Sequence, residues 1–120
     1  MANPNIVNVS SIYGKVTGQA LTTGVGTIVS NPASSGKIYK INSILVSNID
    51  GTNAADVSVY LYKLQTQAIY LASTISVPAN STLVVLSKDT SIYLEENDSI
   101  RALASAAGDL NLILSYEIIT

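Results

Sequence analysis

Apolar and polar residues alternate along most of the chain, in short runs that end at turn-forming residues. The clearest example is the region 75–101, where apolar runs end at Pro78–Asn80, at Lys88–Asp89 and at Glu95–Asp98. Alternation places successive side chains on opposite faces of a β-strand, and Pro, Asn, Asp and Ser are typical of the turns between strands. This region therefore predicts several antiparallel strands in succession.

The same pattern predicts strands along the rest of the chain. Residues 101–107 are rich in Ala and would also suit a helix ended by Gly108, but so short a helix is marginal, and we expect a strand. Asp50-Gly51 is typical of a β-hairpin and is expected to join the strands on either side of it. The expected strands cover residues 15–23, 25–30, 37–49, 57–64, 68–77, 83–86, 92–94, 101–107 and 110–119.

Two of these segments have patterns that predict their place in a sheet. Residues 37–49 carry apolar side chains at both odd and even positions, which indicates a central strand with one face on the core and the other partly covered. Leu110, Leu112, Leu114, Tyr116 and Ile118 alternate with mostly polar residues in the most regular pattern of the sequence. We expect this last segment to be held within a sheet and to be required for folding.

The number and spacing of the expected strands predict an all-β fold, a single antiparallel β-sandwich of about eight strands formed by residues 15–120. The sequence does not distinguish a jelly roll from an immunoglobulin-like topology. Residues 1–14 are expected to form an extended N-terminal arm, since Pro4 disfavours helix before it. The segment is either a first edge strand or an arm that reaches a neighbouring subunit. Its candidate interface residues are Ile6, Val7, Val9, Ile12 and Tyr13.

The composition favours a protein that assembles with other proteins. Only 12% of the residues are charged, against roughly 25% in a typical soluble protein, while 48% are hydrophobic. A weakly charged surface of Ser, Thr and Asn does little to oppose association. The alternative is a small β domain on which these residues simply occupy strands and turns.

The six basic residues are scattered, so no nucleic-acid partner is expected. No apolar run approaches the length of a membrane span, and no membrane partner is expected either.

The residues offer little for catalysis. The chain has no His and no Cys, which removes the usual nucleophile systems and nearly all zinc sites. Glu95, Glu96 and Asp98 form the single acidic cluster, which could hold Ca²⁺ through carboxylate oxygens or could be a solvated turn. We expect the turn, with no metal, no cofactor and no enzyme activity. Carbohydrate binding stays open, because sandwich loops often bind sugars, although the chain has no Trp and no Phe to stack on them.

Five segments of the chain carry a resemblance to a known group of proteins: Ile38–Asn48, Ile49–Tyr62, Ile75–Leu86, Ile92–Arg101 and Leu112–Ile119. Together they resemble small virion structural proteins of tailed bacteriophages, of the type that infects marine cyanobacteria. The resemblance implies a non-enzymatic β-sandwich subunit that is made in the host cytoplasm and incorporated into the virion. It implies a homo-oligomer whose other partners are virion proteins such as the major capsid protein. A capsid decoration (cement) subunit on the head is favoured, with a neck, tail or fibre subunit as the alternative and a carbohydrate-binding module as the second alternative.

Overall fold

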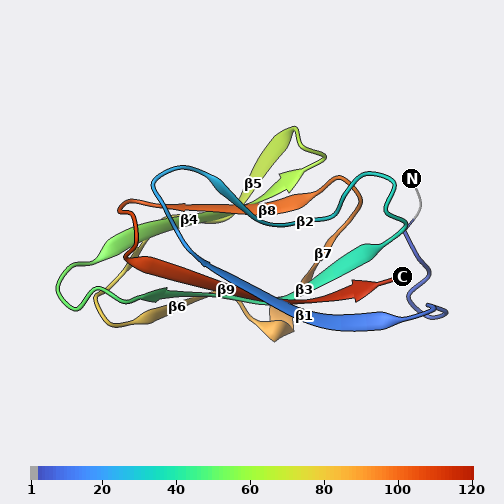
Figure 1. Ribbon diagram of the computed structural model, residues 1–120, viewed down its shortest axis with the longest axis horizontal. Coiled ribbons are helices and arrows are strands. Elements are labelled where there is room, and N and C mark those ends of the chain that lie inside the picture. The colour runs from blue at the N-terminus through green and yellow to red at the C-terminus, as the bar shows by residue number, and fades with distance from the viewer. Residues whose placement is uncertain (1–2) are drawn as a thin grey trace.

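The structure is a computed structural model that describes residues Asn3 to Thr120, and in this range it has nine strands in two antiparallel sheets, which form two layers (Figure 1). Sheet A consists of β1 (Ile12–Ala20), β9 (Leu110–Ile119), β3 (Ile38–Asn48) and β6 (Thr82–Leu86) in that order, with β7 (Ile92–Leu94) also paired to β3. Sheet B consists of β2 (Gly26–Ser30), β8 (Ser99–Ala104), β4 (Ala55–Lys63) and β5 (Gln67–Val77). A short 3-10 helix, η1 (Lys88–Thr90), joins β6 to β7. The predicted all-β sandwich is confirmed.

The order of the strands is that of a jelly roll. The first strand lies beside the last, and the chain changes sheet after β1, β2, β3, β5, β7 and β8, so neighbours in the sequence are mostly not neighbours in a sheet. The β4–β5 connection is a hairpin within one sheet. An immunoglobulin-like sandwich would instead group its strands as ABED and CFG.

The Asp50-Gly51 turn does not form the expected hairpin. β3 and β4 belong to different sheets, because β9 occupies one edge of β3 while β6 and β7 share the other. The turn carries the chain from one layer to the next, and the Asp50 carboxylate accepts hydrogen bonds from the amides of Thr52 and Asn53 at 2.8 and 3.3 Å. The hairpin prediction was therefore wrong, although the residues do reverse the chain.

The core lies between the two sheets. Leu110, Leu112 and Leu114 of β9 are fully buried and belong to the same cluster as Val57 and Val59 of β4. Burying each of these side chains contributes about 1.5–3 kcal/mol. The alternation predicted for β9 is confirmed, and the strand is held between β1 and β3.

A bulge in β3 explains why its apolar residues occur at both odd and even positions. Ile41 pairs with Tyr116 and Ser43 with Ser115, so Asn42 is an extra residue in β3. The core side of the strand therefore changes from odd positions, such as Ile41, to even positions, such as Ile44. The prediction of a central strand is confirmed.

The first four residues of the Ala-rich segment 101–107 form a strand, as expected, whereas residues 105–107 belong to the turn that follows. β8 starts at Ser99, ends at Ala104, pairs with β4 over its whole length and pairs with β2 from residue 99 to residue 102. Gly108, with φ of 84°, lies in the turn that leads on to β9.

The sandwich begins at Ile12, three residues before the expected boundary at residue 15, because Ile12 to Gly14 pair with β9 as part of β1. The described residues before it turn back on the chain. The Asn8 amide donates to the Asn5 carbonyl at 3.0 Å, and the Ser10 amide donates to the Thr120 carbonyl at 2.8 Å. Met1 and Ala2 lie outside the described residues. A role of this segment as an arm that contacts another subunit stays a prediction.

Candidate functional site

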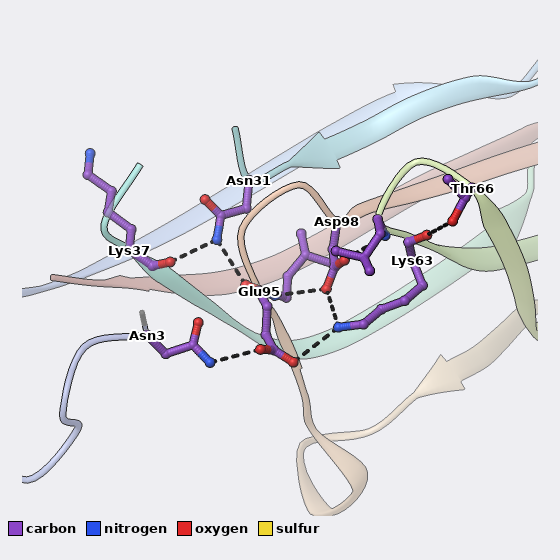
Figure 2. A network of polar contacts seen from close by, with 9 residues as sticks. Asn3, Asn31, Lys37, Lys63, Thr66, Glu95 and Asp98 are labelled. Atoms are coloured by element: carbon purple, nitrogen blue, oxygen red, sulfur yellow. Dashed lines mark hydrogen bonds and ion pairs between the residues drawn. The ribbon is translucent and has the colours of Figure 1, made fainter. Parts of the chain in front are cut away.

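The acidic turn between β7 and β8 is the first candidate site, and Asp98 lies at its centre (Figure 2). The Asp98 side chain is fully buried. Its Oδ2 accepts hydrogen bonds from Lys63 Nζ at 2.9 Å and the Glu95 amide at 3.0 Å, and its Oδ1 accepts one from the Leu64 amide at 2.9 Å. Both oxygens are therefore already occupied by donors from the chain itself.

The two glutamates of the turn have different partners. Glu95 accepts hydrogen bonds from Lys63 Nζ at 3.0 Å and from Asn3 Nδ2 at 2.9 Å, while Glu96 accepts one from the Gly36 amide at 2.6 Å. Within residues 3–120, no three acidic side chains are placed to hold a metal ion together. The turn is therefore a network that joins distant segments.

The charges of this network support one another. The hydrogen bond from Asn3 lowers the pKa of Glu95, as do the hydrogen bond and the positive charge of Lys63. Partial burial acts to lower the pKa of Lys63, but hydrogen bonds and attraction from Asp98 and Glu95 outweigh it and raise that pKa. The ion pairs are thus favoured over a wide pH range.

Asn31, which the sequence did not single out, belongs to the same network. It is buried, and its side-chain amide donates to the carbonyls of Lys37 at 2.9 Å and Leu94 at 3.0 Å. Its backbone exchanges hydrogen bonds with the turn, since its amide donates to the Asp98 carbonyl and its carbonyl accepts from the Asn97 amide. Asn97 has a φ of 70°, a conformation that Asn tolerates well. The loop after β2 is fixed to the acidic turn by these bonds.

The predicted interface residues lie at or just before the start of β1. Ile6, Val7, Ile12 and Tyr13 are exposed, and Val9 is partly buried. Their exposure is compatible with a contact to another subunit, which stays a prediction.

The outer face of sheet A carries an exposed aliphatic row, which we define as Gly18, Ile113, Leu45 and Val84. These residues are direct cross-strand neighbours on β1, β9, β3 and β6, and therefore share one face. Val84 is 57% exposed and Ile113 is 48% exposed. The row extends across the width of the sheet, from one edge to the other.

The rows on either side of the aliphatic row are uncharged. A shallow hollow beside Gly18 and Ile113 lies between β1 and β9. Interface cores are depleted in charged residues, so these three uncharged rows have the composition of a protein contact surface. The flanking rows consist of Val16, Ser115 and Ser43 on one side and of Ala20, Asn111, Ser47 and Thr82 on the other.

Sheet B carries a tyrosine cluster on its outer face, made of Tyr60, Tyr62 and Tyr70 with Arg101. The Tyr60 ring lies 5.0 Å from that of Tyr70 and 6.1 Å from that of Tyr62, between centroids. The Arg101 guanidinium lies 4.2 Å from the centre of the Tyr62 ring and donates to Gln65 at 3.0 Å. Tyr70 is 52% exposed. Tyr and Arg side chains are enriched in protein interfaces, and an exposed tyrosine ring can also stack on a sugar.

Among the residues that the structure describes, no helix is long and apolar enough to cross a membrane.

No protein-family model matches the chain, and no curated protein matches it in sequence. The fold is similar to a solved structure of Bacillus endospore appendages, described as a novel family of disulfide-linked pili. The TM-score is 0.52 and the identity 17%, over 92% of this chain and 87% of that chain. It is also similar to the acidic stable capsid structure of the Helicobacter pylori bacteriophage KHP30. Here the TM-score is 0.53 and the identity 11%, over 94% of this chain and 90% of that chain. At such identities these similarities show a common fold, the β-sandwich.

Proposed function

We propose that the chain is a non-enzymatic structural subunit of a virion that assembles through the outer face of sheet A. The observation that carries this proposal is the set of three uncharged rows around Ile113, Leu45 and Val84, where an aliphatic row remains exposed. Exposed apolar surface rimmed by small polar residues is typical of a surface that another protein covers. The chain as a whole is weakly charged, with 12% charged residues, which favours association.

The position that we propose in the particle is that of a capsid decoration (cement) subunit on the head of a tailed phage, of the type that infects cyanobacteria. Its partners are other copies of itself and the major capsid protein. The likeness of the sequence to small cyanophage virion proteins supports this assignment, and the fold of a phage capsid protein is compatible with it. A neck, tail or fibre subunit is the alternative within the same class. The chain has no cysteine, so it cannot form the disulfide links that the pilus structure is named for.

The protein composition of purified virions tests the proposal. Virions banded on a density gradient should contain this chain at a fixed ratio to the major capsid protein, measured by quantitative mass spectrometry. The proposal is wrong if the chain stays in the particle-free fractions.

Two substitutions test the face itself. Val84→Asp should remove the chain from virions while leaving its unfolding transition unchanged, because Val84 lies outside the core and a charge would have to be desolvated at the contact. The matched control is Val25→Asp, since Val25 is 53% exposed but lies before β2, away from sheet A. Equal incorporation of both variants would show that assembly uses another surface.

The tyrosine cluster supports a second candidate function, carbohydrate binding through Tyr62, Tyr70 and Arg101. The Tyr62 ring beside the Arg101 guanidinium and the exposed Tyr70 ring of the same cluster can stack on a sugar and donate hydrogen bonds to it. A glycan array tests this function. It predicts a signal that Tyr70→Ala abolishes, whereas an array without signal for the wild-type chain would remove the candidate.

A further inference from the structure

The four outer edges of the sandwich differ in how well they could pair with another strand. The edge strand β2 covers only Gly26–Ser30 and has a register shift, and β6 covers only Thr82–Leu86 and has another. The longer edge strand β5 has two register shifts, and its Thr74 has a φ of 51°. Short edges and bulges are the usual means by which proteins prevent strand pairing.

β1 has none of these protections. It pairs with β9 over nine consecutive residues without a register shift, and it contains no proline and a single charge, Lys15. No residue between Asn3 and Thr120 pairs with its other edge. A long, regular edge of this kind is a template for another strand.

The hydrogen bonds to β9 define which groups of β1 face outward. Ser11 and Thr120 exchange both of their backbone hydrogen bonds, and the Leu21 amide donates to the Leu110 carbonyl. Because bonded pairs alternate along an antiparallel ladder, the odd residues of β1 bond to β9. The even residues therefore direct their N–H and C=O groups outward. These are Ile12, Gly14, Val16, Gly18 and Ala20.

β1 is self-complementary in one antiparallel register, in which Val16 faces Val16 of a second copy. Gly14 then faces Gly18, Ile12 faces Ala20, and all the outward groups are paired in ten backbone hydrogen bonds. A typical protein interface has about ten. In this register Lys15 faces Thr17 of the second copy. In the neighbouring register, centred on residue 15, the two lysines would lie directly opposite each other, which is unfavourable.

We propose that two copies of this chain associate by antiparallel pairing of β1 with β1 about a two-fold axis at Val16. The pairing joins the two A sheets into one continuous sheet and places Val16, which is 68% exposed in the single chain, against Val16 of the second copy. The proposed function includes contacts between copies of this chain, and the β1 pairing specifies one such contact. The pairing rests on the proposed function only for the place of the dimer in the virion.

Single-cysteine variants test the register, because the natural chain has no cysteine. In the proposed pair the two Cα atoms at position 16 lie about 5.5 Å apart, within the range of about 4.4–6.8 Å that a disulfide spans. The two Cα atoms at position 14 are offset by four residues, about 14 Å along the strand. Under mild oxidation Val16→Cys should therefore form a cross-linked dimer, and Gly14→Cys should not. Gly14 is a suitable control, since a Cβ there meets nothing within 4 Å.

The oligomeric state in solution gives a second measurement. Sedimentation equilibrium should show a reversible dimer of the wild-type chain, and Val16→Lys should weaken it about fivefold, because it places like charges opposite each other, at about 1 kcal/mol. Val84→Lys, on the same face but far from β1, should leave the dimer unchanged. A loss of the dimer with Val84→Lys alone would indicate face-to-face contact and overturn the pairing.

The remaining outcomes also separate the pairing from the proposed function. A wild-type chain that stays monomeric at millimolar concentration, or equal cross-linking of the two cysteine variants, overturns the pairing whatever virions contain. Open-ended filaments without a cross-link at position 16 would indicate a head-to-tail contact and overturn it too. A cross-linked dimer of a chain that is missing from virions keeps the pairing and contradicts the proposed function.

Discussion

The substitution Asp98→Ala removes the centre of the network that fixes the turn between β7 and β8. The Asp98 carboxylate is fully buried and accepts hydrogen bonds from Lys63 Nζ and from the amides of Leu64 and Glu95. At full burial, each hydrogen bond to a charged group contributes about 1.5–3 kcal/mol. The Lys63 side chain is 32% exposed and keeps its ion pair with Glu95, so the loss of its bond should contribute little, and the two amide bonds should each contribute near the lower limit. We expect a total decrease in the free energy of unfolding of about 3 kcal/mol.

Urea unfolding followed by circular dichroism measures this change, with the free energy extrapolated to water. The matched control is Asp89→Ala, which removes the same charge from an exposed position in η1 and should change the free energy of unfolding by less than about 0.5 kcal/mol. Asp98→Asn should fall between the two, since it keeps an acceptor oxygen and loses the charge opposite Lys63. If Asp98→Ala were as stable as Asp89→Ala, the network would not stabilise the fold, and the structural role of the acidic turn would be wrong.

Three further predictions concern the same fold. Stability should be nearly constant between about pH 5 and 10. Glu95, with its lowered pKa, contributes above the ordinary value of 4.5 and loses this contribution as the pH falls through the lowered pKa. Lys63, with its raised pKa, contributes below 10.5 and loses its contribution as the pH rises through the raised pKa. Thermal unfolding measured from below the lowered pKa of Glu95 to above the raised pKa of Lys63 should show both limits, and Glu95→Gln should weaken the acid limit; an unchanged acid limit would contradict the assignment. Deletion of Leu110–Thr120 should abolish cooperative thermal unfolding, because β9 pairs with both β1 and β3, and a truncated chain that still unfolds cooperatively would contradict its placement. Millimolar calcium should leave the melting temperature unchanged, since the oxygens of Asp98 already accept hydrogen bonds, whereas a rise with Ca²⁺ would restore the metal site.

The strands were predictable from the sequence because alternation is a local property. The Leu110–Leu114 pattern, for example, identified β9 and its buried side correctly. Bulges are not visible in alternation, so the change of side at Asn42 in β3 could not be foreseen. Asp50 and Gly51 suit a turn within a hairpin and a turn between two sheets equally well. The sequence therefore could not show that this turn joins strands of different sheets.

The candidate sites were only partly predictable. The sequence identified the acidic cluster, but its main partners, Lys63 and Asn3, are distant in the sequence and come close only in the folded chain. The aliphatic row could not be recognised for a similar reason. Ile113 lies in an apolar strand between two buried leucines, and only the position of sheet B shows which side stays open.

An electron cryomicroscopy density map of the assembled virion tests the central claim most directly. We predict jelly-roll density for this chain on the outside of the head shell, with Ile113 and Val84 covered by a neighbouring subunit. The same density in the neck, tail or fibre would support the role as a virion subunit but contradict the proposed position on the head. A map in which every protein of head, neck, tail and fibre is assigned, and none is this chain, would contradict the account.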